Sequence, residues 1–528
     1  MKPLQPTFDL ATSRWLDDVN RQVATVAHRV GRRNYAAGAR VARKPGWVTS
    51  SMSANADIHA SLDTVRARSR QLAKDSPHMR KYLAMVANNV IGPAGMRLQA
   101  RALDGAQMDA LANAAIEEAW ARFGARGVCE ASGKHSMLSL CHMLAKTAPR
   151  DGECLIRFLL GANARNDFGI ALQVLDVDRL DTQFNRQADG TSNAIRMGVE
   201  IDSFMRPVAY HFRNRHPGDP YTTHGQGNER LRIPADEIIH MFVADRPEQV
   251  RGMPWGHAVI AELDDLGAFR TAAQFAARFG AEKGGFFTSP ADDDAGAAEL
   301  ASGIEVPGGE ADGESEGGGQ YVMDSEPGKY EVLPNGFQFQ QIDTKYPSDM
   351  YGDFIKEGVR DVATGLCVAY HSLGNNLEGV SFSSIRSGTL EDRDAWMVLQ
   401  AWFVDEFMDR VFDRWLAMAL AMGQVTLPNG SALPLRNLEK FRRHVWMPRR
   451  WEWVDPKNDI EADLAAVRAG LKAPQDVAAK LGQDYEDTLR KIKQARDMAD
   501  LLGVPISWQS TPQQAQQQPG VAQPQAAT

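Results

Sequence analysis

Hydrophobic residues recur every three or four positions between Gly256 and Lys283, a spacing that places them on one face of a helix. Such a helix would be about 40 Å long at 1.5 Å per residue. Pro254 suits its first turn, because a fixed φ and a missing N–H cost nothing there. Charged residues interrupt the apolar face, so the helix is too polar to span a bilayer. A buried helix of a large soluble domain would show the same periodicity. The apolar positions are Val259, Leu263, Leu266, Phe269, Ala273, Ala276 and Phe279.

A second helical pattern begins at Ser348 and runs to Leu366, with Phe354, Val359 and Val362 on its apolar face. Between the two patterns, residues 288–330 are acidic and rich in glycine, a composition typical of a partly mobile segment. A long helix, an excursion and a return helix together predict a rod that carries a tip.

The stretch His371–Gly388 breaks the helical periodicity, because its glycine and asparagine residues stop helices and permit turns. A very long helix is predicted next, over residues 384–422. It and the helix over 254–283 carry more apolar face than short partners can cover, which suggests packing between subunits. Three further helices are predicted to end near Gly470, Gly482 and Gly503.

The first half of the chain mixes helices with strands. Two helices broken at Ser76-Pro77 are followed by strand patterns. Residues 14–31 predict a basic amphipathic helix, residues 50–60 a flexible polar connector, and the Gln/Pro-rich residues from 509 a disordered tail. The predicted strands cover residues 96–100, 153–160, 170–177, 195–201, 207–212 and 238–243. The fold class is therefore α+β.

Composition adds little to this picture. The 528 residues are 43% hydrophobic and 24% charged, which is ordinary for a soluble globular protein, and the net charge of −8 argues against a protein that coats nucleic acid. Four cysteines without a CxxC pair indicate unpaired thiols in a reducing compartment, and buried inert positions are expected for Cys154 on a strand and Cys367 on a helix face. With no long apolar run, neither secretion by a standard signal nor a membrane anchor is expected.

Candidate catalytic chemistry is sparse. The segment Gly127–His135 resembles a P-loop, but its glycines are one residue too far apart and His135 replaces the Ser/Thr that would bind Mg²⁺. Asp151 with Glu153, and Asp176 with Asp178, could pair as metal ligands of a nuclease, yet carboxylates near strand ends are common by chance. His371 and His444 show no partner in the sequence. We therefore expect no enzyme, no cofactor and no metal site.

Four blocks of the sequence, in order, resemble the portal proteins of tailed bacteriophages of the lambda-type family. The first has an Arg-Ser-Arg helix, an Asn-Asn-Val-Ile-Gly helix end and a strand; the second has Arg-Pro and Arg-Gly-x-Pro-Trp; the third has Ser-Ser-x-Arg; the fourth has Trp-x-Trp-x-Asp-Pro. They occupy Arg66–Ala100, Arg246–Leu266, Glu378–Trp396 and Trp451–Leu471, so the resemblance covers nearly the whole chain.

The resemblance implies a portal-like α+β subunit with long stem helices, a mixed α/β wing, a small clip and a helical crown, assembling into a ring, usually of twelve. Its transferred parts are an N-terminal arm and connector at 1–61, wing at 62–253, stem helix at 254–287, acidic clip at 288–347, return stem helix at 348–370, tunnel loop at 371–388, long helix and wing return at 389–454, crown at 455–507 and tail at 508–528.

The implied function is that of a head–tail connector at one capsid vertex, which nucleates head assembly and passes double-stranded DNA during packaging and ejection. The implied partners are copies of the same chain, the terminase large subunit, major capsid and scaffold proteins, and head–tail adaptor proteins, but no membrane. The implied location is the virion, after assembly in the cytoplasm of a bacterial host. The expected tunnel-loop residues are His371, Asn375, Asn376, Ser381 and Arg386, and the expected terminase-facing clip residues are Asp292, Asp293, Asp294, Glu314 and Glu316.

Two alternatives remain at this point. A DNA-processing enzyme, such as a nuclease or packaging ATPase, would need a triphosphate or metal motif that the sequence does not show. A head–tail adaptor would typically be far shorter. The acidic tip fits a passage that repels DNA, because each lysine or arginine that contacts a phosphate adds affinity; a solvated acidic loop without that role would have the same composition.

Overall fold

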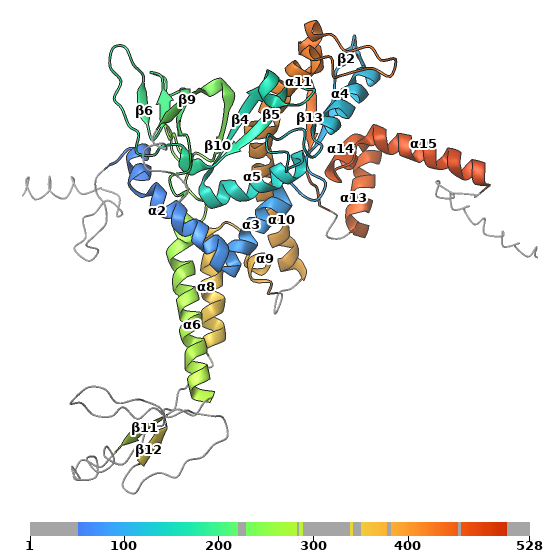
Figure 1. The fold of residues 1–528 in the computed structure, drawn as a ribbon. Coiled ribbons are helices and arrows are strands. Elements are labelled where there is room, and N and C mark those ends of the chain that lie inside the picture. Colours follow the sequence, from blue (N-terminus) through green and yellow to red (C-terminus); the bar gives the residue numbers. More distant parts are fainter. Residues whose placement is uncertain are drawn as a thin grey trace, which may run out of the picture. The chain divides into compact units, whose positions relative to one another are not determined.

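The computed structural model describes residues 51–219, 229–281, 285–288, 338–341, 350–376, 382–451 and 456–503. The chain divides into two units, Met1–Ser53 and Ala54–Thr528, and every helix and strand below lies in the second (Figure 1). The predicted N-terminal helix, most of the acidic excursion and the glutamine-rich tail lie outside the described residues.

The first two helices, α2 (Ala54–Asp75) and α3 (Pro77–Val90), are separated at Ser76 as predicted. The Ser76 hydroxyl accepts a hydrogen bond from the Met79 N–H, which caps α3. The predicted flexible connector is wrong from Ala54 onward. Ala54, Ile58 and Leu62 recur at a spacing of four and are buried, so their burial stabilises a helix that the polar residues between them conceal.

A three-stranded antiparallel sheet lies in the middle of the fold, in the order β10 (Ile238–Phe242), β4 (Glu153–Leu160) and β5 (Ile170–Leu175). Helix α5 (Met137–Asp151) leads directly into β4, and α4 (Ala110–Phe123) precedes α5. The left-handed Gly152 (φ 90°) ends α5 and starts the strand. The three predicted strands are confirmed.

A second antiparallel sheet has the order β6 (Ala194–Arg196), β7 (Val199–Ile201), β8 (Pro207–Arg213) and β9 (Arg230–Pro234). The single strand predicted over 195–201 is wrong, because Met197 (φ 48°) and Gly198 (φ 83°) reverse the chain in a tight hairpin. Strand β9 was not predicted.

The long C-terminal helix is confirmed over 382–421, as α10 (Phe382–Phe403), a π-helical turn (Val404–Met408) and α11 (Asp409–Ala421). The apolar face of α11 is covered within the subunit, and Trp120 of α4 packs edge-on against Trp415 at 4.9 Å between ring centroids. Strand β13 (His444–Met447), which was not predicted, pairs antiparallel with β1 (Arg97–Ala100), which lies about 350 positions earlier. The short elements nearby are β2 (Leu103–Asp104), β3 (Gln107–Met108) and α12 (Leu438–Phe441).

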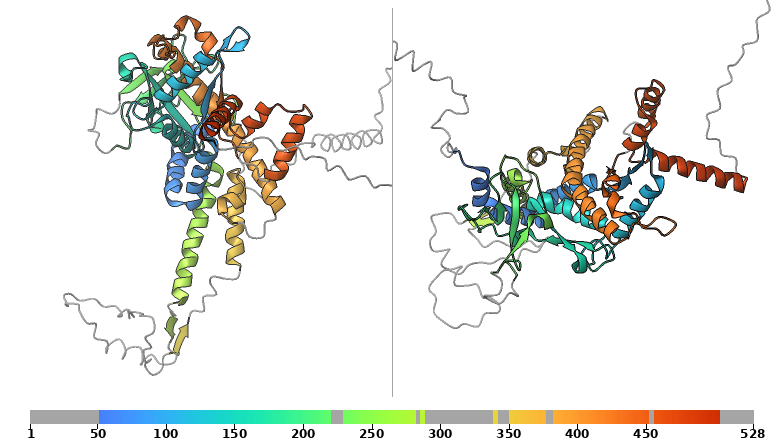
Figure 2. Two further views of the ribbon diagram at one scale, coloured as in Figure 1. Left: turned by 90° about the vertical axis from the view of Figure 1, so that its right-hand side faces the viewer. Right: turned by 90° about the horizontal axis from the view of Figure 1, so that it is seen from above.

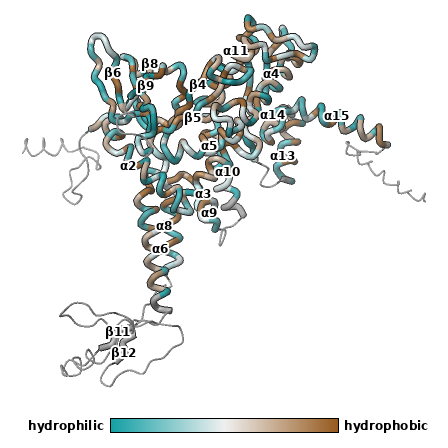
Figure 3. The backbone as a smooth tube through the Cα atoms, in the orientation of Figure 1, coloured by the Kyte–Doolittle hydropathy of each residue, from teal (hydrophilic) through white to brown (hydrophobic). Residues whose placement is uncertain are grey.

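Helices α6 (Ile260–Ala281) and α8 (Tyr351–Gly365) run side by side (Figures 1 and 2). The Phe269 and Phe354 ring centroids lie 4.6 Å apart, and a Cβ at Gly365 would lie 2.3 Å from the Val259 side chain, so the pair is antiparallel. Hydrophilic and hydrophobic residues alternate along both helices (Figure 3). Strands β11 (Gly285–Thr288) and β12 (Gln338–Gln341) pair antiparallel, with Phe287 opposite Phe339.

The last three helices are α13 (Pro456–Arg468), α14 (Pro474–Lys480) and α15 (Tyr485–Leu502). Gly470, Gly482 and Gly503 follow them with positive φ, as the sequence predicts. Within the described part of the chain, none of the helices is long and apolar enough to cross a membrane.

Candidate functional site

The expected tunnel-loop stretch His371–Gly388 is largely helical at both ends. His371 lies in a short helix, α9 (Tyr370–Gly374), and α10 already begins at Phe382. Asn375, at φ 51°, ends α9 in a left-handed conformation, which asparagine tolerates. The predicted break is therefore shorter than the sequence suggests, and Ser381 lies outside the described residues.

Helix α9 is fixed to its surroundings by polar contacts. The Asp392 carboxylate on α10 accepts hydrogen bonds from the Ala369 N–H at 3.0 Å and from the Ser372 hydroxyl at 3.3 Å. Burial raises the pKa of Asp392. The Lys81 ammonium of α3 donates to the Asn375 side chain at 3.1 Å, and the Asn376 amide donates to the Tyr370 hydroxyl at 3.2 Å. Two of the expected tunnel-loop residues, Asn375 and Asn376, thus fix the end of α9 to its surroundings.

Arg386, the one basic residue expected to contact DNA, forms an ion pair. Its guanidinium donates to Asp459 of α13 at 3.0 Å, and both side chains are about one-third exposed. This pair connects the start of α10 with the C-terminal helices. The pair also compensates the positive charge of Arg386, which the sequence alone suggested would contact DNA phosphates.

A fully buried carboxylate, that of Glu153 on β4, joins three distant segments. It accepts hydrogen bonds from Arg66 of α2 at 2.8 Å, from Arg251 before α6 at 3.0 Å and from His240 of β10 at 2.9 Å. We call these four residues the Glu153 cluster. Burial acts to raise the pKa of Glu153, but Arg251, His240 and Arg66 outweigh it and hold this pKa well below its usual range. The carboxylate is therefore ionised and serves as the joint between α2, the sheet and the base of α6.

The backbone approaches closely at the same joint. The Gly252 N–H donates to Glu153 at 3.0 Å, and a Cβ at Gly252 would lie 2.1 Å from the Gly152 carbonyl oxygen. Only glycine fits between these two chain segments. The Arg-Gly of the second sequence block is thus explained by one buried ion pair and one close backbone approach.

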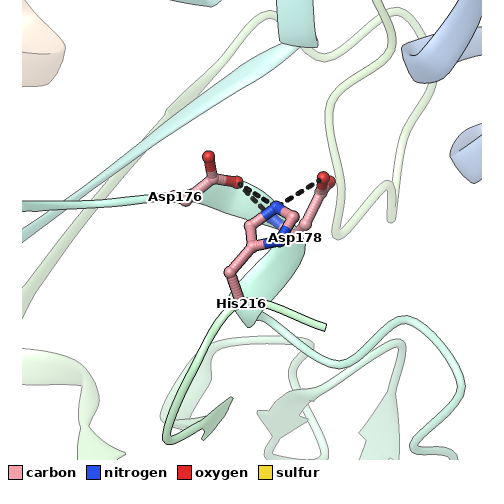
Figure 4. A group of neighbouring side chains, drawn as sticks. All are labelled: Asp176, Asp178 and His216. Atoms are coloured by element: carbon pink, nitrogen blue, oxygen red, sulfur yellow. Dashed lines mark hydrogen bonds and ion pairs between the residues drawn. The ribbon is translucent and has the colours of Figure 1, made fainter. Parts of the chain in front are cut away.

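Asp176, Asp178 and His216 lie together, as Figure 4 shows, and Arg66 connects Asp178 with the Glu153 cluster. Asp178 accepts hydrogen bonds from Arg66 at 3.2 Å, from Arg70 and from His216 at 3.3 Å. Burial acts to raise the pKa of Asp178, but Arg70 and Arg66 outweigh it and lower this pKa. Two guanidinium groups already compensate its charge, so the arrangement favours ion pairing over cation binding.

The other pair considered as nuclease ligands is divided between partners. Asp151 accepts hydrogen bonds from Arg70 and Arg150, both at 2.9 Å, while Glu153 faces its own cluster. His444, which showed no partner in the sequence, contacts Asp409 at 3.0 Å. The expected clip residues Asp292, Asp293, Asp294, Glu314 and Glu316 all lie outside the described residues.

The cysteines are free, and Cys154 is buried as expected. The prediction for Cys367 is wrong. Helix α8 ends at Gly365, and Cys367 follows in a left-handed conformation (φ 55°) with an exposed side chain.

Sequence reasoning missed the Glu153 cluster, because its members are far apart along the chain. One signal was present: Glu153 opens a strand pattern whose other residues are apolar except Arg157, and a carboxylate buried in a strand requires cationic partners.

Comparisons with known proteins agree on a family. A sequence model described as phage portal protein, lambda family, matches residues 40–400. A probable portal protein of Halomonas phage phiHAP-1 is 32% identical over 463 residues, which cover 87% of this chain and 85% of that protein. Portal protein B of Escherichia phage lambda is 24% identical over 138 residues, 26% of each protein.

Among solved structures, a chain from the neck of an empty gene transfer agent particle is 14% identical, with a TM-score of 0.39 over 81% of this chain and 93% of that one. The family match confirms the resemblance read from the four sequence blocks and gives no support to a nuclease or packaging ATPase. The chain belongs to the lambda family of phage portal proteins, a structural and not an enzymatic family.

Proposed function

We propose that twelve copies of the chain form a closed ring at one capsid vertex, through which double-stranded DNA is packaged and later ejected. In this proposal the ring nucleates head assembly with major capsid and scaffold proteins, docks the terminase large subunit and then binds head–tail adaptor proteins. It is assembled in the cytoplasm of a bacterial host and remains in the virion. The family match over residues 40–400 carries the proposal.

Exposed aromatic residues on the α6–α8 pair support a ring. Phe275 is 65% exposed and Phe354 57% exposed, although both lie on helices whose other faces are packed. Two helices alone cannot bury these rings, and a neighbouring copy of the same pair can. We therefore assign α6 and α8 to the stem. The apolar face of α11 is covered within its own subunit, so this part of the second long helix needs no such neighbour.

The segment around α9 is the proposed tunnel loop, with His371, Asn375, Asn376, Ser381 and Arg386 near the DNA path. Its chemistry supports weak contact with DNA, because Arg386 is paired with Asp459 and the asparagines are neutral. Each unpaired cation on a phosphate would release counterions and strengthen binding, which opposes sliding.

The acidic residues between the stem helices are proposed to face the terminase. Asp292, Asp293, Asp294, Glu314 and Glu316 belong to a stretch, 288–330, whose only basic residue is Lys329. Such a charge attracts a basic docking surface and repels the duplex, and both effects suit the end of a channel that receives DNA from a motor.

Negative-stain electron microscopy of the purified full-length chain tests this function. We expect closed rings with a central opening in end-on views. Phe275→Glu with Phe354→Glu should leave a folded subunit and remove the rings, while Phe204→Glu, at a residue 78% exposed on the β7–β8 turn, should keep them. A wild-type protein that stays monomeric would overturn the proposal.

A further inference from the structure

Two arginines stack on one tryptophan beside α10. The guanidinium carbons of Arg393 and Arg449 each lie 5.8 Å from the Trp451 ring centroid, and the Trp451 N–H donates to the Asn89 side chain at 3.2 Å. We call Arg393, Arg449 and Trp451 the arginine–tryptophan cluster. Together with its partner Asn89, the cluster unites residues of the first, third and fourth sequence blocks. Asn89 and Arg393 are more than 300 positions apart in the chain.

The arginine–tryptophan cluster carries two guanidinium groups. Across the described ranges, neither Arg393 nor Arg449 forms an ion pair; Arg449 donates only to neutral oxygens of Asn88 and Asn89. The Arg393 Nε is buried and has no hydrogen-bond partner. The carboxylate that most offsets Arg393, Asp459, is already bonded to Arg386. Burial lowers the pKa of Arg393 and of Arg449.

Another side of α10 carries the complementary charge. Glu391, Asp394 and Val398 are exposed there, and we call them the acid–apolar stripe. At roughly 100° per residue, these side chains point about 160°, 100° and 140° away from Arg393 around the helix. In the part of the chain that the structure describes, neither carboxylate of the stripe has an ion-pair partner. Val398 is 69% exposed, so the stripe also has an apolar part.

We infer that in the ring the acid–apolar stripe of one copy docks on the arginine–tryptophan cluster of the next. The inference rests on the proposed ring and names one of its interfaces. Glu391 and Asp394 would supply the carboxylates that Arg393 and Arg449 lack, in charge-assisted hydrogen bonds, while Val398 covers the Trp451 ring. Because the two surfaces are different and lie on different sides of one helix, the contact is head-to-tail, the kind that generates a ring.

Charge reversal tests this contact. One variant carries Arg393→Glu with Arg449→Glu, and a second carries Glu391→Arg with Asp394→Arg. Each alone sets like charges against each other, so we expect the fraction of subunits in rings to fall by at least about tenfold. Mixed in equal amounts, the two variants restore both contacts in alternation, and rings should return. Matched controls are Arg68→Glu and Glu118→Arg, at exposed helical positions.

The outcomes separate this inference from the proposed function. The contact would be overturned if either variant alone formed rings, or if an equal mixture of the two folded variants formed none. The proposed function would still stand in both cases, provided that the wild-type protein forms rings. Full rings with weakened binding of duplex DNA would assign the arginines to phosphates and also overturn it. If a double variant fails to fold, Arg393→Gln and Asp394→Asn replace it, and each should lower the salt concentration at which rings dissociate; no shift in either contradicts the contact.

Discussion

The Glu153 cluster makes a strong prediction about stability. Glu153→Gln keeps the shape of the side chain but removes the charge that faces Arg66 and Arg251, whose side chains are 1% and 0% exposed. Arg66 would retain its ion pair with Asp178 at 3.2 Å, whereas Arg251 would keep only neutral acceptors, among them the carbonyl oxygens of Leu180 and Met197. The substitution thus leaves an uncompensated buried cation at the base of α6.

The magnitude follows from burial. Removing one partner of a buried ion pair costs about 3–5 kcal/mol. The matched control is Glu237→Gln, which breaks the pair between Glu237 and Arg157, side chains about 30% exposed, at a cost of about 0–1 kcal/mol. For a domain of this size a loss of 3–5 kcal/mol lowers the Tm by about 5 °C.

Thermal unfolding followed by circular dichroism, at one protein concentration for all variants, measures the difference. We expect Glu153→Gln to unfold at a clearly lower temperature than Glu237→Gln, which should stay near the wild type. Equal Tm values for the two variants would refute the idea that Glu153 holds the joint together.

Three further predictions follow from single positions. Burial lowers the pKa of His240, so its contribution to stability is fully present above the unfolded-state pKa of about 6.5 and is lost as the pH falls below that value. The Tm of His240→Gln should therefore depend less on pH between 7 and 5 than the wild-type Tm, and an unchanged dependence would refute this. Thiol labelling of the native protein should show one fast cysteine per subunit, lost in Cys367→Ser, since Cys129, Cys141 and Cys154 are buried; a fast phase that persists would contradict this. Gly252→Ala should prevent stable folding, whereas Gly267→Ala, with open space on α6, should stabilise by about 0.5–1 kcal/mol, and equal soluble yields and Tm values would contradict the close approach.

Local pattern was sufficient for much of the fold. The apolar spacing from Val259 to Ala276 predicted α6, and the glycines after α13, α14 and α15 predicted where those helices end, because periodicity and left-handed termini are local properties. Strand β13 was missed because its four residues are stabilised by pairing with β1, some 350 positions earlier.

The site was less accessible to sequence reasoning. The partners of Arg386 and Glu153 come from distant segments, so the sequence alone could not show that Arg386 is bonded to Asp459. The helical spacing that placed Cys367 on the face of α8 could not show that the helix ends two residues before it. The sequence blocks that carry the family resemblance are far apart along the chain. The structure brings residues of these blocks together at the Glu153 cluster and at the arginine–tryptophan cluster.

Native mass spectrometry of the purified full-length chain tests the closed ring most directly. The account predicts one dominant species at twelve times the 58.1 kDa subunit mass. A spectrum dominated by the single 58.1 kDa subunit, from a folded sample at micromolar concentration and moderate salt, would contradict it.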